Sequence, residues 1–299
     1  FSLGLLLGLI LSLKSIGIIL SLSFIFFIFY LTKLNKKKII FLLFGLLVFP
    51  TIERFYHGKY SIGSKGDSVL YQSFLGKIFM ISGQKDFEKS VFIDKDDNLI
   101  KDLIKQSSSV NKFLDEIKNP YLFLDLHADY EVIAQYQILE INDQNREEIR
   151  NLFFRILEKY PTQFLKLSLN HYLGLWFPGG KQIFLNEYLY ENQNVQLPLK
   201  EELNNVSGST LGISKMLLLL NLIFFNILLL SFTLITINSL VNLYKRKIDL
   251  IDAFVIIIQI YLIAVSFTNI STPRYFMPIY PLTLLIVFSK FRNYSRNFI

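Results

Sequence analysis

An arginine and a tyrosine stand together between two apolar stretches near the end of the chain. Arg274-Tyr275 follows the apolar residues 248–268 and precedes the apolar residues 276–289, with prolines on both sides. A guanidinium held where membrane meets water is suited to an anionic group at the same depth, such as a lipid phosphate. The alternatives are that Arg274 reaches lipid headgroups from a helix end and that Tyr275 joins an aromatic belt. We take both residues as candidate ligands of a lipid phosphate.

A second group of cationic and titratable side chains follows the apolar residues 39–52. Arg54, His57 and Lys59 lie close together in the sequence, where the chain is expected to leave the membrane. Two interpretations stay open for them. They anchor the helix end at the interface, or they contact a lipid phosphate.

Metal-binding chemistry is not predicted. The stretches His127-Ala-Asp129 and 94–97 contain ligand types, but three scattered histidines give no zinc spacing. The aspartates of 94–97 lack the glycine and the closing glutamate of a calcium loop. We expect both stretches to be solvated acidic turns and His171 to be solvated or packed rather than catalytic. No cofactor motif is identifiable.

Composition sets the class of the protein. The chain is 52% hydrophobic, its mean hydropathy is +0.40, and long apolar runs predict an all-α polytopic membrane protein. We expect about six transmembrane helices, three within residues 1–52, with the first cut short, and three within 214–299 before a cytoplasmic tail. A mainly helical extracytoplasmic region, 53–213, is inserted between the third and fourth. The six apolar segments are 1–13, 15–31, 39–52, 216–243, 248–268 and 276–289.

Loop charges orient these helices. The loops 33–38 and 245–247 and the C-terminal tail contain ten basic residues, whereas the short turns on the other side contain only Lys14 and Arg274. Because cytoplasmic loops are rich in lysine and arginine, residues 53–213 are predicted to lie outside. Residues 51–215 contain 19 basic and 22 acidic residues, so the basic total charge does not indicate nucleic acid. The absence of cysteine fits a bacterial envelope protein, and with the apolar helices we expect the inner membrane.

The extracytoplasmic region shows uneven helical patterns. Residues 51–80 are expected on the membrane surface, 84–119 are expected to be mobile, and 121–141 favour a helix. Asn145 with Glu148 resembles a capping box. It precedes a helix whose apolar face has Ile149, Leu152, Phe153, Ile156 and Leu157.

A second amphipathic helix is predicted to begin at Pro161 and to end before Pro178. Its predicted apolar stripe is Leu165, Leu169, Tyr172 and Trp176. The helices near 145–177 either lie in the membrane interface or face the core of a small outer domain.

The Arg-Tyr-x-x-Pro-x-x-Pro pattern of residues 274–281 resembles the closing segment of GT-C membrane glycosyltransferases. These include the dolichyl-phosphate-mannose protein mannosyltransferases and the bacterial aminoarabinose transferases. Three other stretches agree, in a patchy resemblance that runs from end to end of the chain. They are a glycine-rich helix closed by Lys14 (4–14), the segment leaving the membrane (50–58), and the amphipathic helix before the next span (160–176).

The resemblance implies transfer of a sugar from a polyprenyl-phosphate carrier to a lipid or protein acceptor on the outer face. In that family the catalytic carboxylate lies in the first outer loop, which is expected upstream of this chain. The resemblance leaves room for a divalent metal in the full-length protein, and the fragment alone is expected to be inactive. The alternative is a non-catalytic polytopic protein, either a scaffold or a flippase-like carrier of lipid phosphates.

Overall fold

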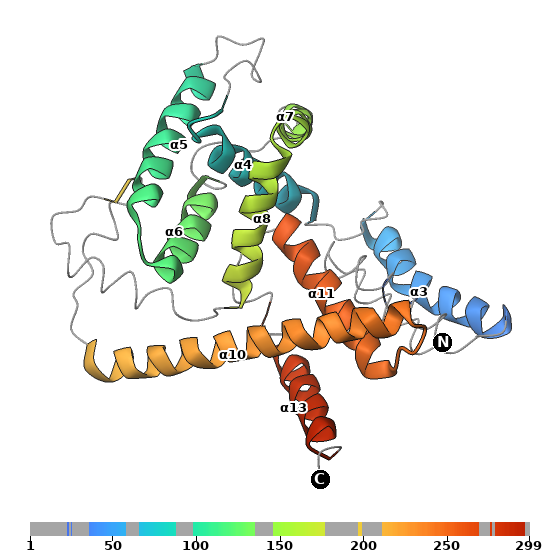
Figure 1. The fold of residues 1–299 in the computed structure, drawn as a ribbon. Helices are drawn as coiled ribbons and strands as arrows, with labels where there is room; N and C mark the ends of the chain where they lie inside the picture. Colours follow the sequence, from blue (N-terminus) through green and yellow to red (C-terminus); the bar gives the residue numbers. More distant parts are fainter. Residues whose placement is uncertain are drawn as a thin grey trace. The chain divides into compact units, whose positions relative to one another are not determined.

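The computed structural model of the chain describes residues 36–57, 66–87, 98–134, 146–176, 211–268 and 279–296, together with Ser23, Ile25, Leu197, Pro198 and Phe276. Secondary structure within these residues is entirely helical, as predicted (Figure 1). The helices are α3 (Lys36–His57), α4 (Gly66–Ser82), α5 (Asn98–Glu116), α6 (Pro120–Ile133), α7 (Arg146–Lys159), α8 (Pro161–Leu175), α10 (Leu211–Tyr244), α11 (Leu250–Thr268) and α13 (Tyr280–Arg296).

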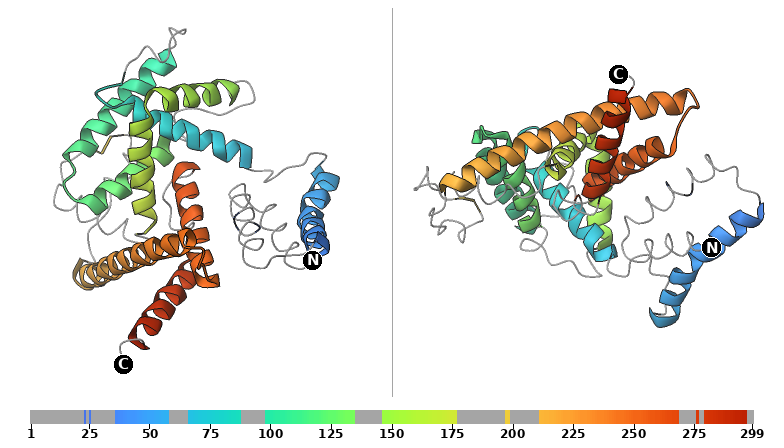
Figure 2. Two further views of the ribbon diagram at one scale, coloured as in Figure 1. Left: turned by 45° about the vertical axis from the view of Figure 1, so that its right-hand side comes forward. Right: turned by 90° about the horizontal axis from the view of Figure 1, so that it is seen from below.

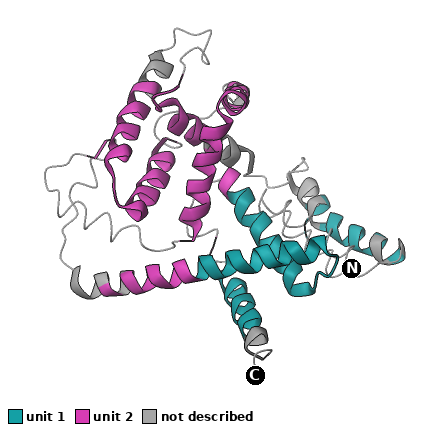
Figure 3. Ribbon diagram, in the orientation of Figure 1, with its two compact units in different colours: residues 1–69, 228–265, 278–299 teal, residues 70–227, 266–277 magenta. Residues whose placement is uncertain are grey.

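The chain divides into two compact units, which Figure 3 colours separately. Unit 1 contains residues 1–69, 228–265 and 278–299, and unit 2 contains 70–227 and 266–277. Boundaries fall inside α4, α10 and α11, so each of these helices contributes residues to both units.

Two of the described helices are long and apolar enough to cross a membrane. They are Leu219–Tyr244 within α10 and Leu250–Thr268, and they agree with the predicted segments 216–243 and 248–268. The apolar part of α13, Tyr280–Phe291, is shorter than a span requires. Six transmembrane helices are therefore not confirmed. The segments 1–13 and 15–31 lie outside the described residues, except for Ser23 and Ile25.

Polar side chains join the helices of unit 1. Asp252, only 1% exposed, accepts hydrogen bonds from Ser239 and Asn242 of α10 at 2.8 and 2.9 Å. Lys290 of α13 donates to the same carboxylate at 2.9 Å. One carboxylate thus ties α10, α11 and α13 together, and Asp249 precedes α11 and accepts from the Asp252 amide. We assign this cluster a structural role, because each partner satisfies the buried charge.

Unit 2 is built around an apolar core supplied by α4 to α8. Its largest contributor is α4, where Leu75 and Ile78–Ile81 are at most 2% exposed. Rings add to this core: Phe74 stacks on Phe153 of α7 with centroids 4.0 Å apart. In the views of Figures 1 and 2, α6 and α8 lie side by side, and α8 starts where α7 ends.

The α4 and α5 regions differ from the sequence predictions. Residues 66–80 belong to the helix α4, and its residues from Phe74 onward contribute to the core of unit 2 instead of lying on a membrane surface. Within the stretch 84–119, which was predicted to be mobile, α5 forms and buries Val110 and Leu114. Charged and serine residues dominate the composition of α5, but its apolar residues recur at helical spacing, and this spacing is enough to bury one face.

The α7 prediction is confirmed and the α8 prediction holds only in part. Ile149, Phe153 and Ile156 are buried, with Leu152 and Leu157 packed beside them. The start of α8 at Pro161 is also confirmed. The stripe assigned to α8 was wrong at two positions, because Leu165 and Leu169 are more than half exposed.

The face that α8 buries includes polar side chains, and the apolar pattern therefore misled the sequence prediction. It contains Phe164, Leu167, Ser168, His171 and Leu175. Trp176 is fully buried and contacts the Phe276 ring at a centroid distance of 4.9 Å. The sequence left open whether this helix lies in a membrane interface or faces the core of a domain. In unit 2 it faces the core.

Candidate functional site

A fully buried lysine lies at the centre of unit 2. Lys77 is on α4, and neither its side chain nor that of Glu131 on α6 has any exposed surface. Its Nζ atom lies 3.1 Å from His171 Nδ1, 3.6 Å from Glu131 Oε1 and 3.4 Å from the carbonyl oxygen of Ser266. The Phe164 ring covers it at 5.9 Å. Burial lowers the pKa of Lys77, and the charge of Glu131 opposes that effect.

Two contacts indicate the tautomer of His171, which is 1% exposed. An ammonium group has no acceptor, so Nδ1 must accept the hydrogen bond from Lys77. An ionised carboxylate only accepts, so Nε2 must donate to Glu131 Oε2, 2.6 Å away. Hydrogen bonds and ion pairs thus form a closed network among three side chains, Lys77 of α4, His171 of α8 and Glu131 of α6.

Glu131 is ionised in this environment. Burial by itself would raise the pKa of Glu131, but the electrostatic interactions with His171 and Lys77 and the hydrogen bond from His171 outweigh it and bring that pKa to about 2. The carboxylate therefore keeps its negative charge throughout the neutral range. Replacing either partner would leave the other as a buried charge, a change that usually costs about 3–5 kcal/mol.

A second histidine lies next to this network of three side chains. His127 precedes Glu131 by one helical turn on α6, and its ring meets the His171 ring edge to face with centroids 5.8 Å apart. Its Nδ1 atom is completely covered and has no hydrogen-bond partner. Such an unsatisfied atom costs about 1–3 kcal/mol. Burial and the electrostatic effect of the neighbouring His171 lower the pKa of His127 to about 3, so the ring is neutral at pH 7.

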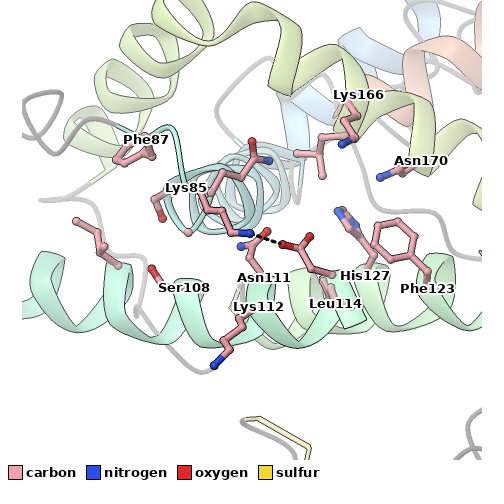
Figure 4. Close-up of a pocket in the computed structure, with 16 residues that line it drawn as sticks. Lys85, Phe87, Ser108, Asn111, Lys112, Leu114, Phe123, His127, Lys166 and Asn170 are labelled. Carbon is pink, nitrogen blue, oxygen red and sulfur yellow. Dashed lines mark ion pairs between the residues drawn. The ribbon is translucent and has the colours of Figure 1, made fainter. Parts of the chain in front are cut away.

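A pocket of about 510 Å³ opens beside His127 (Figure 4). Three lysines line it, Lys85, Lys112 and Lys166, against the single carboxylate of Asp115. Lys85 pairs with Asp115 at 3.7 Å, and both side chains are largely exposed. In Figure 4 the His127 ring points toward Lys166 and Asn170 of α8. The remaining wall is partly apolar, with Phe87, Ile104, Phe123 and Leu167.

The pocket suits one class of ligand. Lysine ammonium groups in excess over carboxylates favour an anion, and a neutral imidazole at the wall can offer a ring nitrogen for one hydrogen bond. The apolar wall favours a ligand that also has hydrocarbon. Behind His127, the contacts with Glu131 and Lys77 fix the orientation of the His171 ring.

The predicted lipid-phosphate ligands are placed only in part. Arg54 and His57 belong to the last turns of α3, which extends past Pro50, and their side chains are not among those described. Lys59, Arg274 and Tyr275 lie outside the described residues, as do Asn145 and the aspartates of 94–97.

Sequence reasoning missed the buried cluster. His127 and Asp129 are part of α6 and not of a solvated turn, and His127 is only 7% exposed. His171 is packed, which is one of the two outcomes expected for it. The available signal was Lys77 inside an apolar run and the spacing of His127 and Glu131, which places both on one helical face.

Comparison with known proteins adds no assignment to this site. A scan of protein-family models, a search of curated proteins and a search of solved structures each found no match to this chain.

Proposed function

We propose that this chain is part of a membrane glycosyltransferase that takes a sugar from a polyprenyl-phosphate carrier and transfers it to a lipid or protein acceptor on the outer face. In this proposal the protein is integral to a bacterial inner membrane, with residues 53–213 extracytoplasmic. The proposal starts from the resemblance of residues 274–281 to the closing segment of GT-C enzymes. The two apolar helices of membrane-spanning length are consistent with it.

The observation that supports it best concerns the chain on both sides of Arg274. Phe267 packs on Phe164 near the start of α8, with centroids 5.5 Å apart. Phe276 packs on Trp176 just after the end of the same helix. The residues flanking the candidate phosphate ligand thus belong to unit 2 and contact the helix that contributes to the pocket.

The pocket has the composition expected for the headgroup end of such a carrier. Lys166 and the other lysines supply positive charge for a phosphate, and the amide of Asn170 and the imidazole of His127 supply hydrogen bonds for sugar hydroxyls. The apolar side chains of its wall suit the first part of a prenyl chain. A phosphate ester with an attached hydrocarbon is therefore the ligand class that we assign to unit 2.

The alternative function is a non-catalytic membrane protein that binds or carries lipid phosphates. It uses the same pocket and the same arginine but makes no glycosidic bond. Only a transfer assay on the full-length protein separates the two, because both predict binding.

Binding is tested with the full chain in detergent and three probes: a short-chain prenyl phosphate, the corresponding prenol, and inorganic phosphate. We expect the prenyl phosphate to bind at least tenfold more tightly than either of the others, since only it has both the charge and the hydrocarbon. Arg274→Ala and Lys166→Ala are each expected to weaken this binding. Lys105→Ala, an exposed lysine of α5 outside the pocket, is the matched control.

Equal affinity for the prenol and the prenyl phosphate would contradict the proposed ligand class. Transfer is tested separately in the full-length protein, where Arg274→Ala should abolish sugar transfer without loss of folding. Near-normal turnover in that variant would remove Arg274 from the site. Binding without any transfer would leave the lipid-phosphate carrier as the function.

A further inference from the structure

Two of the three histidines of the chain meet a glutamate in the core of unit 2, although the sequence keeps the two histidines far apart. His127 and Glu131 are one turn apart on α6, so both side chains lie on the same face of that helix. His171 comes from α8, which packs against this face. Each residue offers one ligand atom, and these three atoms lie within 4.8 Å of one another.

We propose that His127, Glu131 and His171 bind a divalent transition-metal ion of the zinc type at the wall of the pocket. Two imidazoles and a carboxylate form a ligand set that proteins use for zinc, and it leaves a fourth position for water or a substrate. His127 lines the pocket, so that fourth position would lie on the pocket side. The site shares His127 with the pocket, but metal binding there does not require the proposed transferase function.

The strongest support is His127 Nδ1. The atom is fully covered and has no hydrogen-bond partner, although the ring is more than nine-tenths buried. A histidine that serves only to fill a core normally pairs both nitrogen atoms or leaves one to solvent. A metal ion would use the lone pair that the protein leaves unmatched.

The required movements are small. Ligand atoms that each lie about 2.0–2.2 Å from one zinc ion are separated by about 3.3 Å in a tetrahedral arrangement. The two ligand atoms that lie farthest apart, at most 4.8 Å, must therefore approach each other to about 3.3 Å. The contact between His171 Nε2 and Glu131 Oε2 must open from 2.6 Å. Rotations of side chains on two packed helices can provide both changes.

The surroundings and the ligand types indicate which ions could bind. Nearby aromatic rings, such as that of Phe123 beside His127, limit the access of bulk water. Imidazole ligands select zinc, copper, iron or nickel rather than magnesium or calcium.

Two features oppose a metal, namely the proton that His171 Nε2 donates to Glu131, which an ion would have to displace, and Lys77. Its Nζ atom lies 3.6 Å from Glu131 and 3.1 Å from His171, where it supplies the positive charge that an ion would otherwise provide. A metal ion and a lysine ammonium therefore compete for the same carboxylate. This competition yields a test, because removing the ammonium should strengthen metal binding, whereas loss of a merely structural ion pair should not.

The experiment uses the full chain, purified in detergent and stripped of metal with a chelator. Cobalt(II) is titrated in while its visible absorption is recorded, and zinc is then used as a competitor. We expect one ion per chain and bands of a four- or five-coordinate site, with displacement by zinc. His127→Leu should weaken cobalt binding at least tenfold, and Lys77→Met should tighten it severalfold.

The control is His57→Ala, because His57 is the remaining histidine of the chain and belongs to α3. It should bind cobalt like the unaltered protein. No cobalt band, or a band that His57→Ala removes and His127→Leu does not, would overturn the proposal. If His127→Leu fails to fold, the test relies on Lys77→Met. A cobalt affinity of Lys77→Met that is equal to or weaker than that of the unaltered protein overturns the proposal. Because the readout is metal uptake, its failure leaves the prenyl-phosphate binding result unaffected.

Discussion

Replacing Glu131 by glutamine should destabilise unit 2 strongly. The substitution preserves size but removes the carboxylate that pairs with Lys77, whose side chain has no exposed surface. It also leaves the proton on His171 Nε2 without an anionic acceptor. Breaking a buried pair by removing one partner typically costs about 3–5 kcal/mol. Because a domain is usually stable by about 5–15 kcal/mol, this loss is a large fraction of the total.

The chain contains a built-in probe for this measurement. Trp176 is its single tryptophan, and it is fully buried in unit 2. Its fluorescence therefore follows the unfolding of unit 2 without a contribution from elsewhere. Urea unfolding in a mild detergent, read at Trp176, gives the free energy of unfolding for the unaltered protein and for Glu131→Gln. Chelator in all samples keeps bound metal from changing the comparison.

Two further variants make the result specific. Asp115→Asn breaks the exposed pair with Lys85 and should cost under about 1 kcal/mol. Lys77→Met combined with Glu131→Leu removes both charges and should recover most of the loss, since apolar residues often replace a buried pair without cost. A Glu131→Gln variant no less stable than Asp115→Asn would refute the assignment of a buried, charge-balanced cluster.

Three other predictions follow from the same structure. The folded-state pKa of His127, about 3, lies below its ordinary value of 6.5, so the unfolded chain binds this proton first. The free energy of unfolding should therefore fall from about pH 6.5 toward pH 3 more steeply than in His127→Leu; parallel pH curves would contradict this. Gly83→Ala should lower the urea midpoint, because a β-carbon at Gly83 would overlap the Ser107 backbone; an unchanged midpoint would show that the backbone shifts freely. A reporter fused near Ser108 should be exported and one at Arg246 cytoplasmic, and the reverse pattern would refute the predicted topology.

Helix positions were predictable where apolar spacing or proline was clear. Pro161 is a favourable first residue of a helix, and it begins α8. The two long apolar segments also agree with α10 and α11. The α5 helix was missed because its composition is charged, and composition outweighed the spacing of its apolar residues.

The buried cluster could not be predicted, because it depends on tertiary packing. Lys77, Glu131 and His171 come from three helices, and no local spacing links them. On α8, the predicted apolar stripe did not include His171, because a pattern based on hydrophobic residues does not count a histidine. Only the contact between α6 and α8 brings its imidazole to Glu131.

Prenyl-phosphate binding in the pocket of unit 2 is tested most directly by photolabelling. The membrane-embedded full chain is labelled with a photoreactive prenyl phosphate, and the labelled peptides are mapped. We expect label on the α6 and α8 residues that line the pocket, such as Phe123 and Asn170, and competition by unlabelled prenyl phosphate but not by prenol. Label confined to the apolar helices of unit 1, with equal competition by the prenol, would contradict this expectation.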